Sequence, residues 1–118
     1  MEQDNKKPYD LQKRTEKFAR RAREYVKKLP RTLGNFEDAK QLIRASGSVG
    51  ANYIEAEEAL SKKDFILRIK ISRKEAKESR YWFELIESLD DQKEEKQALI
   101  QEATELTKIF GSIITKSE

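Results

Sequence analysis

Apolar side chains recur every three or four residues along most of this chain, and this spacing most constrains its fold. In the first segment the spacing alternates as 4-3-4-3-4 through Leu11, Thr15, Phe18, Ala22, Tyr25 and Leu29. Such a rhythm places one apolar stripe along a helix, as in the seam of a helical bundle. Three later segments show helical spacing too, and strand signals are lacking. The sequence therefore predicts an all-α protein.

Residues that stop or cap helices divide the chain into four of them. Pro30 ends the first helix, Asn35 is a favourable N-cap for the second, and Ser61 with Asp64 has the spacing of a capping box. Residues 91–94 are expected to cap the fourth. We expect helices at about 10–29, 36–60, 62–89 and 92–115. Their short connections predict an antiparallel up-down-up-down four-helix bundle over residues 10–115, with a disordered polar tail at 1–9.

The second helix has polar or very small residues where a bundle helix normally has leucine. Gly47 and Gly50 each cost roughly 1 kcal/mol relative to alanine in a helix interior. Polar residues in the same stretch fall at i, i+4, i+8 and i+11, on one helical face. We expect a close helix crossing and a polar seam there, with two glutamates of the third helix as partners. The predicted structural polar seam comprises Arg44, Ser48, Asn52, Glu55, Glu75 and Glu78.

The third helix has two apolar faces. One faces the bundle core, and the other carries Leu67, Ile71, Trp82, Leu85 and Leu89. A helix of this length that is apolar on two sides faces a second surface. In a chain of 118 residues we expect that surface to be a partner subunit, which predicts a homo-oligomer.

The composition excludes several classes of chemistry. The chain has no cysteine and no histidine, so it lacks a thiol nucleophile, a disulfide and the commonest general base and metal ligand. We expect no cofactor and no enzymatic activity. A metal site made only of carboxylates is a distant alternative, with Glu55, Glu58, Glu75 and Glu78 as its ligands. There is no apolar run of roughly 18 residues and no secretory h-region, which predicts a cytoplasmic protein without a membrane segment.

Positive charge is concentrated in two segments. The net charge is only +3, but residues 11–31 carry +7 and residues 62–80 carry +5. Such asymmetry suggests an anionic partner, although lysine-rich helices can also simply be solvated. Phe18 and Tyr25 fall on the core side of the first helix, so base stacking is not predicted there. The candidate nucleic-acid-binding residues are Arg14, Lys17, Arg20, Arg21, Lys27 and Lys28.

Three motifs resemble a known family. They are QLIRASGSVGANYIEA at 41–56, SKKDF at 61–65 and SRKEAKESRYW at 72–82. Together they resemble the bacterial 23S rRNA intervening-sequence proteins, also called the S23 ribosomal protein family. Many members have glycine where this chain has Ala56. The positions that match the family pattern are Gln41, Arg44, Ala45, Ser48, Val49, Ala51, Asn52, Glu55, Asp64 and Phe65.

The resemblance implies an antiparallel four-helix bundle that assembles as a ring, typically a homopentamer. The chain is also similar to the accessory variability determinant of diversity-generating retroelements. That protein is a basic pentamer that binds nucleic acid and a reverse transcriptase. The biochemical role of the family is not established, and no enzymatic activity is implied. The first hypothesis is therefore a non-enzymatic, oligomeric protein that binds RNA or DNA. The alternative is a scaffold that docks a protein partner such as a reverse transcriptase.

Overall fold

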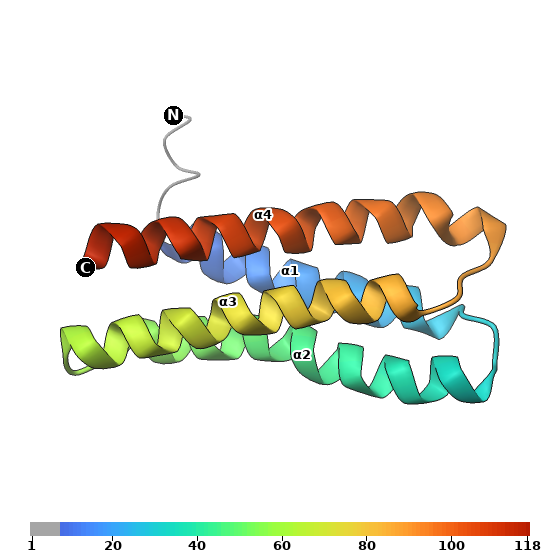
Figure 1. Ribbon diagram of the computed structural model, residues 1–118, viewed down its shortest axis with the longest axis horizontal. Helices are drawn as coiled ribbons and strands as arrows, with labels where there is room; N and C mark the ends of the chain where they lie inside the picture. The colour runs from blue at the N-terminus through green and yellow to red at the C-terminus, as the bar shows by residue number, and fades with distance from the viewer. Residues whose placement is uncertain (1–7) are drawn as a thin grey trace.

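The computed structural model describes residues 8–118, with side chains from Asp10 onward, and forms a four-helix bundle (Figure 1). All regular structure in this part of the chain is helical. The elements are α1 (Pro8–Lys27), α2 (Leu33–Glu57), α3 (Lys62–Leu85), the short 3-10 helix η2 (Asp90–Gln92) and α4 (Lys93–Ser117). The expected disordered tail at 1–9 lies mostly outside the described residues, but α1 already begins at Pro8.

The helices lie along one another, and the bundle places α1 and α3 at diagonal corners. α1 packs against α2 and α4, and α3 packs against the same two helices. Figure 1 shows the α1–α2 and α3–α4 connections at one end and the α2–α3 connection at the other. Within residues 8–118, none of the helices combines the length and apolar character that a membrane crossing requires.

Aromatic side chains fill the core towards its ends. The ring of Phe83 on α3 makes edge-on contacts with Phe18 and Tyr25 of α1, with centroids 6.1 and 5.7 Å apart. Tyr53 of α2 packs against Phe110 of α4 at 6.2 Å. Each large side chain buried in this way stabilises the fold by roughly 1.5–3 kcal/mol. The core therefore joins all four helices.

Small residues let α1 and α3 approach the backbone of α2 closely. A Cβ atom at Gly50 would lie 2.8 Å from Oγ1 and 3.2 Å from Cβ of Thr15 on α1. From α3, the buried hydroxyl of Ser72 donates a hydrogen bond to the carbonyl of Val49 at 3.0 Å. The expected close helix crossing is thus present, and Gly50 is the position that requires it.

The start of α2 differs from the prediction that Asn35 is its N-cap. Thr32 is the N-cap, and its hydroxyl accepts the backbone N–H of Asn35 at 3.1 Å, so the helix begins at Leu33. The buried Asn35 side chain instead donates to the carbonyls of Pro30 and Glu87 and accepts the N–H of Glu87 at 2.9 Å. Asn35 therefore ties two connections together. By contrast, Ser61 caps α3 as predicted, accepting the N–H of Asp64 at 3.0 Å.

The α3–α4 connection also differs from the prediction. α3 ends at Leu85 rather than 89, because Ile86 is extended and the backbone of Glu87 bonds Asn35. The N-cap of α4 is Gln92, within the expected cap at 91–94, but no side chain makes a capping hydrogen bond there. The buried Gln92 accepts the N–H of Leu89 at 3.0 Å and donates to the carbonyl of Tyr25 at 3.3 Å. A contact to α1 thus sets the start of α4.

Replacing Gly50 with alanine is expected to lower the free energy of unfolding by about 1–3 kcal/mol, because the added methyl group would overpack against Thr15. This loss should occur although alanine favours a helix by about 1 kcal/mol. Urea denaturation followed by circular dichroism measures it.

Gly47→Ala is the matched control for that substitution. A Cβ at Gly47 meets only the flexible guanidinium of Arg23, at 3.4 Å. This variant should be neutral or more stable by up to about 1 kcal/mol. Equal stabilisation by both substitutions would contradict the close crossing at Gly50.

Candidate nucleic-acid interface

Positive charge lies on two opposite sides of the bundle. α1 carries seven basic and three acidic residues, and α3 carries eight and four, so each helix has a net charge of +4. α2 has a net charge of −2 and α4 is neutral. Because α1 and α3 occupy diagonal corners, the molecule presents two basic sides separated by neutral or acidic ones.

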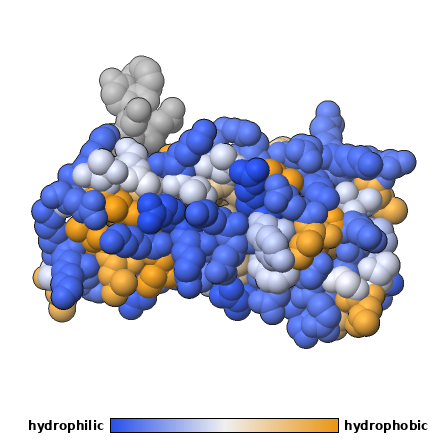
Figure 2. All heavy atoms as spheres, viewed as in Figure 1, coloured by the Kyte–Doolittle hydropathy of each residue, from blue (hydrophilic) through white to orange (hydrophobic). Residues whose placement is uncertain are grey.

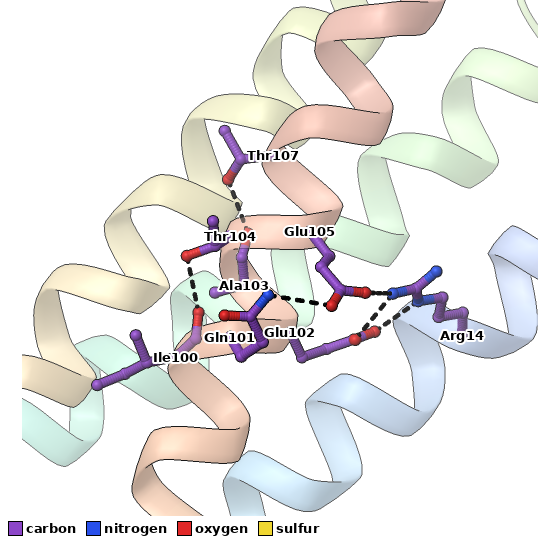
Figure 3. Close-up of polar contacts among 8 residues, drawn as sticks. All are labelled: Arg14, Ile100, Gln101, Glu102, Ala103, Thr104, Glu105 and Thr107. Carbon is purple, nitrogen blue, oxygen red and sulfur yellow. Dashed lines mark hydrogen bonds and ion pairs between the residues drawn. The ribbon is translucent and has the colours of Figure 1, made fainter.

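On α1, the predicted nucleic-acid-binding residue Arg14 is bound by α4. Its guanidinium donates to both carboxylate oxygens of Glu102, at 2.6 and 2.9 Å, and to Glu105 at 2.7 Å (Figure 3). These contacts, led by the hydrogen bond to Glu102, raise the pKa of Arg14. The pKa of Glu105 is lowered, because Gln101 and Arg14 donate hydrogen bonds to it. Arg14 thus joins α1 to α4.

The other five predicted residues, four on α1 and Lys28 directly after it, differ in how far their charge is neutralised. Arg21 also faces α4 and lies 3.4 Å from Glu95. Arg20 pairs with Glu16 at 2.8 Å and Lys27 with Glu24 at 3.0 Å, both in exposed pairs along the helix. Such exposed pairs are worth only about 0.2–1 kcal/mol and exchange easily with other partners. Lys17 and Lys28 are exposed and have no ion-pair partner among the described residues.

A second basic surface lies on α3 and was not singled out as a site from the sequence. An open groove of about 620 Å³ runs along α3 beside Gln41 and Arg44 of α2. In the described part of the chain, its cations Arg73, Lys74 and Lys77 have no ion-pair partner. Lys70 lies 3.9 Å from Glu118. We call this surface the α3 groove; its lining on α3 is formed by Lys70, Arg73, Lys74, Lys77, Glu78, Tyr81 and Trp82.

Two adjacent aromatic residues lie at one end of the α3 groove. Tyr81 is 54% exposed, and its ring meets that of Trp82 edge-on at 5.0 Å. Trp82 is half-buried and packs against the hydrophobic core, so it holds the tyrosine in place. The signals in the sequence were the excess charge of residues 62–80 and the adjacent Tyr-Trp pair. Trp82 had been placed on an apolar face instead.

The predicted polar seam lies between α2 and α3, and four of its residues make side-chain contacts there. Arg44 lies 3.4 Å from the buried Glu75 and 3.3 Å from Glu78. The Asn52 side chain accepts a hydrogen bond from Arg68 at 3.0 Å and donates to the carbonyl of Ser48. Arg68 was missed by the sequence analysis.

Two predicted seam residues take little part in it. Ser48 contributes its backbone carbonyl rather than its hydroxyl. Glu55 is exposed, and its side chain makes no hydrogen bond or ion pair within residues 8–118. The carboxylates proposed as a distant metal site are not grouped either. In the described residues, no three acidic side chains gather in a way that could hold a metal ion.

The comparisons with known proteins agree with this architecture. The family model for the 23S rRNA-intervening sequence protein matches residues 7–112. This chain belongs to that family. The resemblance noted in the sequence motifs is thereby confirmed. No curated protein matches the chain.

A solved structure of the same family has a similar fold. It is the crystal structure of a protein of unknown function from the S23 ribosomal protein family of Bacteroides thetaiotaomicron. The two chains are 32% identical with a TM-score of 0.74, and the match covers 92% of this chain and 97% of that one. This chain and that family member therefore share one fold.

Replacing Asn52 with leucine is expected to destabilise the protein by about 1–2 kcal/mol, because Arg68 loses its acceptor and a hydrogen bond to the Ser48 carbonyl is removed. Urea denaturation is the suitable measurement, since it does not screen charges. Glu55→Gln on the same helix is the control and should change stability by less than about 0.5 kcal/mol. An Asn52→Leu variant as stable as the parent would mean that the seam is not structural.

Proposed function

We propose that this family member is a non-enzymatic, oligomeric protein that binds RNA through the basic sides of α1 and α3. The observation that carries the proposal is the set of outward cations on α3, Arg73, Lys74 and Lys77, which no carboxylate of the described chain neutralises. The family name, which refers to an intervening sequence of 23S rRNA, supports RNA as the nucleic acid.

The binding mechanism is electrostatic. Lysine and arginine neutralise phosphates and release condensed counterions, so affinity is independent of sequence and falls steeply with salt. Double-stranded RNA is recognised largely by its shape and backbone, which suits a rigid helical surface. Lys17 of α1 and Lys28, which directly follows this helix, are available to phosphates, whereas Arg14 and Arg21 join α1 to α4.

We propose further that the bundle, whose successive helices run antiparallel, assembles as a ring-shaped homo-oligomer, with a pentamer as the expected form. Large apolar side chains of α3 and the connection after it support this assembly, since Leu67, Leu85 and Leu89 are each about half exposed. Figure 2 shows apolar patches on the face that carries α3 and α4, interrupted by hydrophilic side chains. A neighbouring subunit would remove these apolar surfaces from water.

A protein-docking scaffold is the second candidate function, and a separate surface favours it. Phe36 is 63% exposed and borders a cleft of about 520 Å³ beside Val26, Leu29 and Ala39. Such a cleft suits an apolar side chain of a partner protein, for example a reverse transcriptase. This candidate predicts weak RNA binding by the purified protein and co-purification with a protein.

The salt dependence of RNA binding tests the proposed function. The slope of log K against log salt for a structured RNA should become shallower by about three in Arg73→Gln/Lys74→Gln/Lys77→Gln and by about two in Lys17→Gln/Lys28→Gln. Fluorescence anisotropy at several salt concentrations measures it. Lys93→Gln, at the start of α4, is the control and should leave the slope unchanged. Absence of RNA binding by the parent protein would refute the proposal.

Light scattering tests the proposed assembly. The parent protein should have the mass of a pentamer, and Leu85→Glu should lower that mass, because a charge would be buried against the next subunit. Ala98→Glu, on the exposed side of α4, should leave the mass unchanged. A monomeric parent protein would refute the assembly.

A further inference from the structure

We infer that the α3 groove is a site for single-stranded nucleic acid, in which Tyr81 stacks on an unpaired base while Lys70, Lys74 and Lys77 hold the adjoining phosphates. This inference rests on the proposed function and adds to it the form of nucleic acid that the site selects. It does not involve α1, where the aromatic side chains that the structure describes, Phe18 and Tyr25, belong to the core.

The spacing of these residues fits an extended strand. Lys70, Lys74, Lys77 and Tyr81 follow one another at i, i+4, i+7 and i+11, which places them on one face of α3. All four are exposed. Eleven residues rise about 16 Å along a helix, which matches about five nucleotides at the roughly 3.4 Å rise of a stacked strand. The row is thus long enough for several phosphates and a terminal stacked base.

An exposed aromatic ring distinguishes this surface from the basic side of α1. On α1, Phe18 and Tyr25 are 1% and 4% exposed and belong to the core, so no base can reach them. Tyr81 is 54% exposed and is oriented by its edge-on contact with Trp82. A paired duplex hides the faces of its bases, whereas a single strand offers them to an aromatic ring. Tyr81 therefore adds affinity only for unpaired nucleotides.

The acidic residue in the groove does not compete with the phosphates. Glu78 lies within 3.3 Å of Arg44 of α2, and Arg44 also contacts Glu75. Arg44 thereby offsets one of these two carboxylate charges, and the groove stays positive because Glu78 is its one acidic lining residue against five cations. Arg73, Lys74 and Lys77 keep their charge for a ligand, since none of them pairs with an acid in residues 8–118.

The experiment compares two ligands, an oligouridine and a fully paired RNA hairpin, by fluorescence anisotropy with the full-length chain. Tyr81→Ala should weaken oligouridine binding by about tenfold, as expected for loss of one stacked base, and hairpin binding by less than about twofold. Tyr81→Trp should retain the affinity for oligouridine. Phe36→Ala removes an exposed aromatic ring outside the groove and should leave both affinities unchanged.

Intrinsic fluorescence gives an independent readout. Trp82 is the one tryptophan of the chain and lies against Tyr81. Oligouridine should therefore change its emission, and the hairpin should not. The change should be lost in Tyr81→Ala.

Five outcomes would overturn the inference. One is an equal loss of affinity for both RNAs in Tyr81→Ala. A second is no loss of affinity for either RNA in this variant. In both cases, RNA binding by the parent protein would still support the proposed function. A third is a changed oligomeric mass of Tyr81→Ala by light scattering, which would make the groove a subunit interface. The fourth is binding of polyglutamate in preference to oligouridine, without dependence on Tyr81, which would make it a site for acidic peptides. A parent protein that binds neither RNA refutes the proposed function as well.

Discussion

The close contact that α2 makes with both neighbouring helices is the constraint on which the rest of the structure depends. Gly50 leaves room for Thr15 of α1, and the Val49 carbonyl accepts the hydroxyl of Ser72 from α3. Since both contacts use the α2 backbone, the helix axes cannot separate without breaking them. This proximity brings Arg44 within reach of Glu75 and Glu78, and it fixes where the outer face of α3 lies.

The fold and the seam were predictable because they depend on local patterns. Apolar periodicity predicted four helices, and the polar stripe of α2 predicted contacts to Glu75 and Glu78. The predicted N-cap of α2 was wrong because the Asn35 side chain bonds Glu87, which is distant in sequence. Gln92 lies within the predicted cap of α4, but its side chain bonds Tyr25 rather than capping the helix. Intrinsic capping preference ranks residues by local hydrogen bonding, so it cannot show that a side chain is already bound elsewhere.

The candidate site was only partly predictable, for a related reason. Positive charge on α1 was evident, but Arg14 and Arg21 bind carboxylates 88 and 74 residues away. No single sequence shows which cations will meet such partners. The charge excess of α3 was visible too. The exposed ring of Tyr81 beside these charges was not recognised as part of a site. Helical periodicity alone assigned Trp82 to an apolar face and gave Tyr81 no role.

Because α1 and α3 lie at diagonal corners and carry equal net charges, the bundle has a charge quadrupole across its long axis and no charge dipole along the line that joins these two helices. The corners formed by α1 and α3 each have a net charge of +4, and they alternate with α2, at −2, and α4, which is neutral. A quadrupolar field falls off more steeply with distance than a dipolar one, and the Debye length at physiological salt is only about 8 Å. An approaching polyanion therefore experiences little torque that would turn one basic side towards it. Which side it occupies is decided only at contact, by the shape and side chains of each surface.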